Sequence, residues 1–310
     1  MSKKILAVTG ATGAQGGGLV RSILADPAGG FAARAITRNP GSEKALALKA
    51  LGAEVVAADL DDVSSLKRAF AGAYGAYGVT NFWEHFSAEK EMAQARNLAE
   101  AAKSAGVAHF IWSTLEDTRK FVPLSDPRMP TLHGKYKVPH FDGKGEADAY
   151  FDPKTTTWLL TSFYWDNLIH FGMGPKPGAD GRLVFGLPMM DRKLPGIAAA
   201  DIGACAYGIF QRPEWIGRRV GIAGEHLTGA EMAAGLTKAL GKEVAYQAIP
   251  FDAYRGLGFP GADDLGNMFQ FNAEFSDAFC GARDTAFSRS LNPKLRTFAQ
   301  WLEENASRIA

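Results

Sequence analysis

The stretch Thr9-Gly10-Ala11-Thr12-Gly13-Ala14-Gln15-Gly16 follows directly on a short apolar run, Ile5-Leu6-Ala7-Val8. The run predicts a buried strand, and the apolar pairs Leu19-Val20 and Ile23-Leu24 beyond the glycines predict one face of a helix. A strand, a glycine turn and a helix start in this order are typical of a dinucleotide site, where a diphosphate approaches backbone N–H groups at the positive end of the helix. The spacing is G-x-x-G-x-x-G rather than the commoner G-x-G-x-x-G, and the alternative is a glycine-rich turn without a ligand.

The composition is that of an ordinary globular protein: of 310 residues, 46% are apolar and 22% charged, and the formal net charge is +1. The balanced charge argues against direct binding to nucleic acid or to an anionic membrane. No apolar run has transmembrane length, and the run after Lys3-Lys4 is too short for a signal peptide. Cys205 and Cys280 make no disulfide framework, and the six histidines lack metal-ligand spacing. We therefore expect a cytoplasmic protein without a metal site or a membrane partner.

Short apolar runs alternate with helical patterns in the first half of the chain, which predicts β-α-β units. The expected strands cover residues 4–8, 31–37, 54–58, 76–80, 109–113 and 157–161. The expected helices cover 15–25, 42–51, 64–71 and 87–105, with Ser42 and Ser64 as N-caps and Gly52 and Gly106 as helix stops. The predicted fold class is α/β, a Rossmann-type, doubly wound parallel sheet with helices on both faces and ligands along the carboxyl edge of its strands.

The regular alternation of strands and helices ends after the fifth expected strand. Residues 116–139 carry four prolines and predict a long loop that overhangs the ligand edge. Helical patterns return at 200–210, 228–240 and 295–308. We divide the chain into a cofactor-binding domain at 1–164, with a segment near 198–212 packed back on it, and a smaller substrate- or partner-side domain made mostly of 165–310.

Polar residues follow the second, third and fourth expected strands. Arg38 stands where an NAD site usually has an acidic residue; its guanidinium can grip a 2′-phosphate, which favours NADP, and the alternative is a solvated surface arginine. Asp59 either contacts the adenine together with Leu60 or caps the turn that follows. Within Thr80-Asn81-Phe82-Trp83, the polar pair is expected to face the cofactor through its backbone, and the aromatic pair lines the same mouth or packs in the core.

Longer stretches carry a family resemblance. They are Gly13-Ala14-Gln15-Gly16-Gly17, Thr37-Arg38-Asn39-Pro40, Val79-Thr80-Asn81, His140-Phe141-Asp142-Gly143-Lys144-Gly145-Glu146, Gly258-Phe259-Pro260-Gly261-Ala262, Asp264-Leu265 and Asn267-Met268-Phe269. In these stretches the chain resembles the NmrA-like family of atypical short-chain dehydrogenase/reductases, and within it the NADPH-sensing members. The resemblance implies a Rossmann domain with a smaller α/β C-terminal domain and a preference for NADP(H).

The resemblance and the residue-level reasoning together predict one set of cofactor contacts. They are Gly10, Thr12, Gly13, Ala14, Gln15, Gly16, Arg38, Asn39, Asp59, Leu60, Thr80, Asn81, Phe82, Lys144, and the stretch from Tyr164 to Asn167. One departure concerns a lysine that relatives carry in the helix after the fourth strand. This chain places Ala93 there, so that contact is missing or is replaced by Lys90.

Short-chain dehydrogenases reduce carbonyls with a Tyr-x-x-x-Lys pair on one helix face, and the pair here is His140-x-x-x-Lys144. His140 is either a proton donor or a capping or packing residue, and Lys144 is expected to hold the nicotinamide ribose. Tyr136 precedes Pro139 and is expected outside the helix. A serine of the usual triad is sought at Ser113-Thr114. Tyr164 is a second candidate donor, with aromatic core packing as its alternative.

Two functions remain open from the sequence, and the absence of the usual tyrosine favours the first. One is a redox sensor or low-activity oxidoreductase, in which NADP(H) occupancy alters the loops near 116–139 and 258–270 and so changes binding to a regulatory protein partner. The other is an NADPH-dependent reductase of carbonyl, quinone or imine substrates, with a non-tyrosine proton donor under aromatic side chains such as Phe82, Trp83, Tyr164 and Trp165. A regulator that touches DNA directly is disfavoured, because the chain has no basic stripe.

Overall fold

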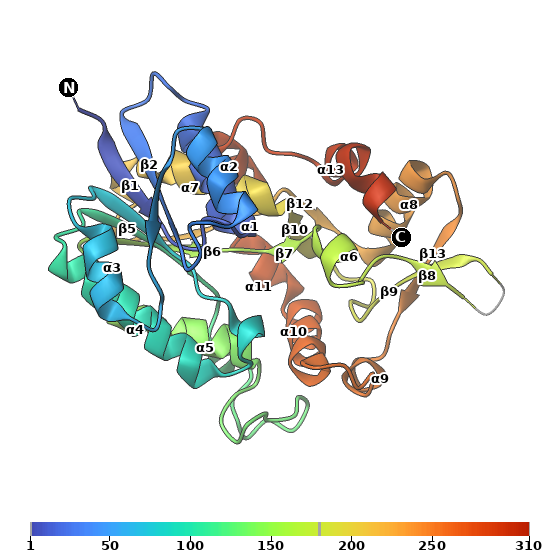
Figure 1. Cartoon of the computed structure of the whole chain (residues 1–310). Helices are drawn as coiled ribbons and strands as arrows, with labels where there is room; N and C mark the ends of the chain where they lie inside the picture. The colour runs from blue at the N-terminus through green and yellow to red at the C-terminus, as the bar shows by residue number, and fades with distance from the viewer. Residues whose placement is uncertain (1, 179–180, 310) are drawn as a thin grey trace.

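A seven-stranded parallel sheet forms one half of the molecule (Figure 1). The structure is a computed structural model that describes residues 2–178 and 181–309. Strand order in the sheet is β11-β6-β5-β4-β1-β2-β3. The strands are β1 (Lys4–Val8), β2 (Phe31–Thr37), β3 (Glu54–Ala57), β4 (Gly75–Gly78), β5 (His109–Thr114), β6 (Thr156–Leu160) and β11 (Arg219–Gly221). The predicted Rossmann-type sheet is confirmed, and β11 is an edge strand that the sequence patterns did not indicate.

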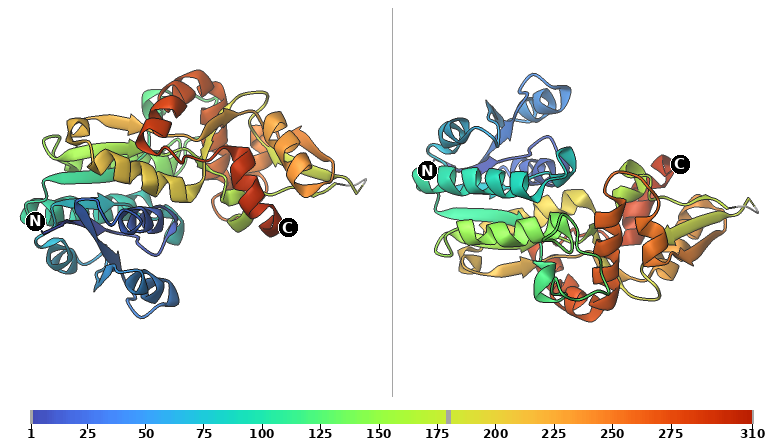
Figure 2. Two further views of the ribbon diagram at one scale, coloured as in Figure 1. Left: turned by 90° about the horizontal axis from the view of Figure 1, so that it is seen from above. Right: turned by 90° about the horizontal axis from the view of Figure 1, so that it is seen from below.

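Helices cover both faces of this sheet, as predicted (Figure 2). One face carries α1 (Ala14–Leu24), α2 (Glu43–Ala50) and α7 (Ala199–Phe210), whose apolar side chains form one core cluster with the sheet. The other face carries α3 (Val63–Phe70), α4 (Ala88–Ser104) and α5 (Pro139–Ala147). β1 lies at the centre, and its residues Leu6, Ala7 and Val8 are fully buried between the two layers.

Most predicted helix ends are confirmed. Ser42 caps α2 by accepting a hydrogen bond from the Ala45 N–H, and Gly52 and Gly106 follow their helices in the left-handed conformation. The expected cap at Ser64 is wrong. Asp62 caps α3 instead, because its carboxylate accepts the N–H groups of both Ser64 and Ser65.

The C-terminal half is a smaller α/β region with two three-stranded sheets, in the orders β12-β10-β7 and β13-β9-β8. Its strands are β7 (Phe163–Tyr164), β8 (Lys176–Pro177), β9 (Leu183–Leu187), β10 (Leu194–Ile197), β12 (Glu225–Leu227) and β13 (Val244–Ala248). Its helices are α6 (Asn167–His170), α8 (Gly229–Leu240), α9 (Phe251–Arg255), α10 (Ala262–Glu274), α11 (Ser276–Gly281), α12 (Thr285–Leu291) and α13 (Phe298–Asn305). Single 3₁₀ turns lie at Phe82–Glu84 (η1), Thr118–Lys120 (η2), Asp148–Tyr150 (η3), Pro213–Trp215 (η4) and Ala306–Arg308 (η5).

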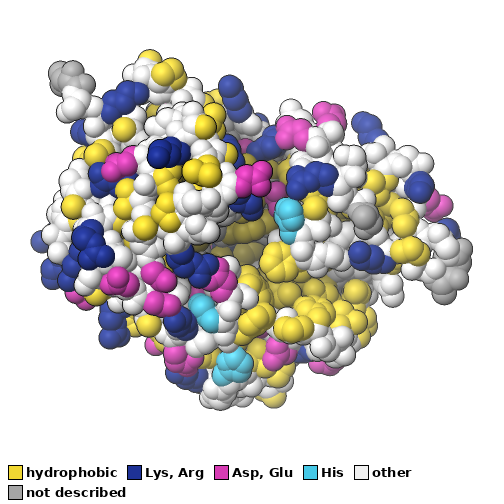
Figure 3. Space-filling view, in the orientation of Figure 1, with side chains coloured by type: hydrophobic (Ala, Val, Ile, Leu, Met, Phe, Trp, Pro, Cys, Tyr) yellow, Lys and Arg dark blue, Asp and Glu magenta, His cyan; other side chains and the backbone are white. Residues whose placement is uncertain are grey.

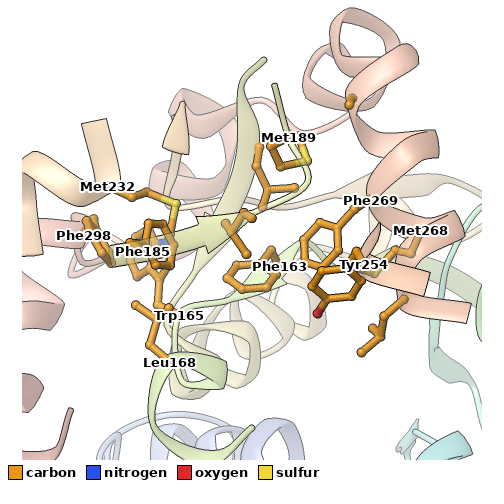
Figure 4. Close-up of a cluster of buried hydrophobic side chains, with 14 of the residues drawn as sticks. Phe163, Trp165, Leu168, Phe185, Met189, Met232, Tyr254, Met268, Phe269 and Phe298 are labelled. Atoms are coloured by element: carbon orange, nitrogen blue, oxygen red, sulfur yellow. The ribbon is translucent and has the colours of Figure 1, made fainter. Parts of the chain in front are cut away.

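This half has a core of its own, rich in aromatic and sulfur-containing side chains (Figure 4). Phe163 of β7 packs against Phe269 of α10, and Trp165, directly after β7, packs against Phe298 of α13. The helix predicted at 228–240 is confirmed as α8. The one predicted at 295–308 begins later, at Phe298, because Thr297 and Gln300 form a capping box. Across the described ranges, every helix is too short or too polar to cross a membrane.

α7 returns from the C-terminal half and lies against α1. The contact is close because two glycines face each other across it. A Cβ on Gly18 would stand 2.4 Å from Ala200 O, and one on Gly203 would stand 2.0 Å from Leu19 N. The position of α1, which carries the glycine loop at its start, therefore depends on α7.

We expect Gly203→Ala to lower the free energy of unfolding by about 1–3 kcal/mol, since the added methyl group overpacks the contact between two helix backbones. Gly281→Ala is the matched control, because no heavy atom lies within 4 Å of its added Cβ. That variant should be as stable as the parent or slightly more stable. Urea unfolding of both proteins checks this; equal midpoints would contradict the close α1–α7 contact.

Candidate active site

A cavity of about 750 Å³ opens at the carboxyl edge of the large sheet, where the C-terminal half meets it. β1 lies between β2 and β4, so the strand order reverses beside β1, which is where ligands of such sheets bind. Figure 3 shows a hollow on this face with hydrophobic side chains gathered beside it. The structure brings the predicted contacts to this one cavity: Gly10, Thr12, Gly13, Ala14, Gln15, Gly16, Arg38, Asn39, Asp59, Leu60, Thr80, Asn81, Phe82, His140, Lys144, Tyr164 and Asn167 all line it.

Each glycine in the loop after β1 is required at its position for a different physical reason. Gly10 has φ +60°, which a side chain rarely adopts, and a Cβ there would stand 2.9 Å from Val79 Cγ1. A Cβ on Gly16 would stand 2.5 Å from Gly10 O, so this glycine lets α1 lie close on the end of β1. Gly13 is the N-cap of α1 and lines the cavity without a side chain in front of the helix end.

The start of α1 has no side-chain cap. The helices that follow β2, β3 and β4 are each capped by a side chain, from Ser42, Asp62 and Ser87 respectively. The first turn of α1 holds no acidic residue, and its N-cap makes no side-chain hydrogen bond. Its N–H groups therefore face the cavity without a side-chain acceptor, and this geometry fits the diphosphate of a dinucleotide.

Arg38, which lines the cavity just beyond the end of β2, is paired rather than free. Its guanidinium lies 3.0 Å from a Glu84 carboxylate oxygen, and the Asn81 amide donates to that same oxygen at 3.2 Å. Both members of the pair are largely exposed, so an anionic ligand can displace Glu84 at low cost. The Asp59 carboxylate accepts the Asp61 N–H, as in the predicted turn-capping alternative, while Asp59 also lines the cavity.

Lys144 is held in a buried polar cluster. Its Nζ lies 2.7 Å from Thr80 Oγ1, 2.5 Å from a Glu91 carboxylate oxygen and 3.3 Å from Thr80 O. Thr80 Oγ1 donates to the same Glu91 oxygen at 2.6 Å, and Glu91 is fully buried. The second Glu91 oxygen lies 3.6 Å from His85 Nε2. The cluster fixes the ammonium at the cavity wall.

His140 is held by a carboxylate from the other half of the molecule. Its Nδ1 lies 2.6 Å from a carboxylate oxygen of Asp264 on α10, and its backbone N–H donates to the second oxygen at 3.2 Å. Because Nδ1 is bound to Asp264, the Nε2 atom is the one left for a ligand in the cavity that His140 lines. The Trp83 ring packs over the imidazole with a centroid separation of 4.9 Å and completes this wall.

Tyr164 belongs to a second network. The Gln15 amide donates to the Tyr164 hydroxyl, while Gln15 Oε1 accepts from the Tyr77 hydroxyl and, at 2.8 Å, from Ser113 Oγ. Burial raises the pKa of both phenols, so each stays protonated at neutral pH. Ser113, sought as a triad serine, is hydrogen-bonded to Gln15 and not to His140.

Some predicted placements are wrong. Lys90, one alternative for the missing lysine contact, is paired with Asp61 at 2.6 Å and does not line the cavity. Ala93 itself faces solvent, and its neighbour Gln94 lines the cavity. Trp165, expected beside the cofactor, is buried in the C-terminal core against Phe298 and Trp301. Helix α5 starts at Pro139, so Tyr136 lies outside it, as predicted.

The loop at 116–139 does not overhang the site. All of its residues are described, and none lines the cavity. It packs instead against α10, where the Asn267 amide donates to Pro130 O and Lys137 O and the Gln270 amide donates to Arg128 O. These hydrogen bonds fix the loop to the C-terminal half.

Several residues of the site escaped the sequence reasoning, among them Glu91, Asp264, Ser162 and Asn272. Glu91 lies in the first turn of a polar helix, where a carboxylate is usually solvated. Asp264 belongs to one of the stretches that carry the family resemblance, but its role becomes visible only in its contact with His140, which is distant in sequence. Ser162 and Asn272 line the cavity and had no sequence signal at all.

The chain belongs to the NmrA-like family, whose model matches residues 2–302. A curated relative, the NmrA-like family domain-containing oxidoreductase FrzB of Cladobotryum sp., is 31% identical over 86% of this chain and 83% of its own. Among solved structures, the negative transcriptional regulator Nmra in complex with NADP superposes with a TM-score of 0.78 at 24% identity, covering 98% of this chain and 95% of the other. The Citrobacter sp. triphenylmethane reductase complexed with NADP(H) gives 0.74 at 18% identity, covering 98% and 99%.

Removing one partner of the Lys144–Glu91 pair leaves a buried charge uncompensated. We expect Lys144→Met to lower the free energy of unfolding by about 3–5 kcal/mol. The double variant Lys144→Met/Glu91→Leu should recover most of that loss, because both charges are gone. Urea denaturation of the two single variants and the double variant gives the coupling; additive losses would show that the two groups do not interact.

Proposed function

We propose that this protein is an NADPH-dependent reductase of an apolar carbonyl, quinone or imine substrate, with His140 as the proton donor. The observation that carries the proposal is the His140–Asp264 pair at 2.6 Å in a cavity that also holds the bare start of α1. A carboxylate on Nδ1 holds the ring in one orientation, so that Nε2 can give a proton to an oxygen or nitrogen in the cavity.

Different residues of the chain would bind different parts of the cofactor. The first-turn N–H groups of α1 would take the diphosphate, Arg38 the 2′-phosphate, and Lys144 a ribose hydroxyl. When bound, NADPH supplies the hydride for the reduction. Relatives support this assignment, since an Nmra structure and a triphenylmethane reductase structure both hold NADP. We also propose that residues 1–164, with 198–212, form the cofactor side, and that most of 165–310 forms the substrate side.

Tyr164 is the weaker candidate for the donor. Burial raises the pKa of its hydroxyl, which makes the phenol a poorer acid. The rings of Trp83 and Phe82 pack against the His140 imidazole, which lines the same cavity. Lys144, four residues on, lies on the same helix and lines the same cavity.

Arg38→Asp tests the choice of cofactor. The variant replaces the guanidinium by a charge that repels the 2′-phosphate, so the Kd for NADPH should rise by about tenfold or more while the Kd for NADH stays within about twofold. Fluorescence titration of both nucleotides measures this. Arg21→Asp, on the same layer but outside the cavity lining, is the control. Equal loss for both nucleotides would contradict a 2′-phosphate role for Arg38.

His140→Gln tests the donor. We expect NADPH oxidation with a quinone or an aromatic aldehyde to fall by about 10²–10⁴-fold in kcat, with the Kd for NADPH unchanged. Tyr164→Phe should keep most of the activity. Full activity in His140→Gln, or loss only in Tyr164→Phe, would contradict the assignment.

A redox sensor is the second candidate, and one observation favours it. Glu84 lies on η1 and pairs with Arg38, so a 2′-phosphate that takes Arg38 also releases η1 and the aromatic side chains beside it. A sensor would bind NADPH with the Arg38-dependent preference described above, yet oxidise it with none of a broad panel of carbonyls, quinones and imines. Turnover that depends on His140 identifies the reductase instead.

A further inference from the structure

Phe171 is a large apolar residue that lines the cavity and is nevertheless 54% exposed. It is the C-cap of the short helix α6, and its backbone N–H donates to Asn167 O at 3.1 Å. Leu168, on the same helix, is buried in the C-terminal core, so the helix is anchored while the Phe171 ring lies at the mouth of the cavity. An exposed phenylalanine stabilises the fold little, and exposed apolar side chains that gather at a cavity mark a binding site.

Phe171 is the outer member of a row of aromatic rings that runs along the cavity wall. Measured between ring centroids, Phe171 lies 6.3 Å from Trp83, and Trp83 lies 4.9 Å from His140. The row continues from His140 to Phe141 at 4.8 Å and from Phe141 to Phe279 at 6.2 Å. All five residues line the cavity, and they come from the end of α6, from η1, from α5 and from α11. These contacts form one continuous aromatic surface with His140 at its middle.

The row runs from solvent to the interior of the molecule. Phe171 is half exposed, whereas Phe141 and Phe279 are buried. His140 is the only member of the row that can carry a charge, and Asp264 already pairs with it. A charged ligand body would find no further counter-charge in this row, so an uncharged body is favoured.

Trp83 is held by its neighbours, whereas Phe171 has room to turn. A Cβ on Gly261, the N-cap of α10, would stand 2.9 Å from Trp83 Cζ3, so Gly261 lets α10 lie close against the indole. Phe82 and Phe86 pack edge to face on Trp83, with centroid separations of 5.4 and 5.8 Å. Phe171 meets the indole at an interplanar angle of 64° from the solvent side. An aromatic ring of a ligand can therefore lie on Trp83 and be covered by Phe171.

We propose that Phe171 is a specificity-determining residue, which together with Trp83 holds a flat aromatic ring of the substrate at the mouth of the cavity. The assignment rests on the proposed reductase function for the identity of this ligand as the substrate. It adds the substrate class: an uncharged aromatic compound whose ring lies on Trp83 and whose reducible group meets His140.

The test uses two probes with one carbon skeleton: 2-(hydroxymethyl)naphthalene and its fully saturated counterpart, 2-(hydroxymethyl)decalin. Each is titrated by calorimetry into the full chain, with and without saturating NADPH, which reduces neither alcohol. Contacts between aromatic rings stabilise a complex beyond the burial of apolar area, so the parent protein should bind the naphthalene at least about threefold more tightly. Phe171→Leu keeps an apolar side chain but loses the ring, and should lower this preference by about threefold or more. Phe171→Tyr should restore the preference.

Phe121→Leu is the matched control. Phe121 is 38% exposed and lies outside the lining of this cavity, so the same substitution there should leave the preference between the probes unchanged. Unfolding midpoints in urea separate ligand binding from a structural role. Because the Phe171 ring is half exposed, Phe171→Leu should unfold at the same urea concentration as the parent.

Three results would overturn the inference: equal binding of the two probes by the parent, an unchanged preference in Phe171→Leu, or a marked loss of stability in that variant. These readouts are independent of the reductase. If NADPH binds but nothing is reduced, a Phe171-dependent preference still establishes the aromatic subsite. If turnover depends on His140 while both probes bind alike, the subsite is wrong and the reductase stands.

Discussion

The uncapped N–H groups at the start of α1 are the constraint on which the rest of the site depends. A helix end left without a side-chain acceptor is stabilised by water or by an anion, and here the main chain reaches the cavity because Gly13 has no side chain to block it. Gly16 lets the helix lie on the end of β1, and the Gly18–Gly203 contact fixes it against α7. The proposed diphosphate site is therefore built by packing around the backbone rather than by side-chain ligands.

The opposite wall is built in part by α10, which contributes two polar side chains. Asp264 holds His140, and Asn267 holds the 116–139 loop through two of its carbonyls. The charges deepest in the site are compensated within the protein, Lys144 by Glu91 and Arg283 by Glu116. The Arg38–Glu84 ion pair differs from these two because it is exposed, so a phosphate can separate it at little cost.

The sequence predicted the parts of the structure that depend on local patterns. The six N-terminal strands and the helices between them follow from apolar periodicity, and the glycine spacing located the start of α1. Parallel topology then brought Arg38, Asp59 and Thr80 to one cavity, because the carboxyl ends of parallel strands share one edge.

The sequence-based predictions that failed concern features that depend on contacts between distant segments of the chain. Asp264 meets His140 across 124 residues of sequence, and no local pattern announces such a pair. The proline-rich stretch at 116–139 correctly predicted a long loop, but its direction is set by amides on α10. Lys90 and Trp165 were placed by adjacency in sequence, whereas their side chains turn to Asp61 and to the C-terminal core.

A crystal structure of the protein grown with saturating NADPH is the most direct test of the central claim. The account predicts the diphosphate against the backbone N–H groups of residues 13–15, with Arg38 turned from Glu84 to the 2′-phosphate. An empty cavity at saturating nucleotide, or a dinucleotide bound away from the start of α1, would contradict it.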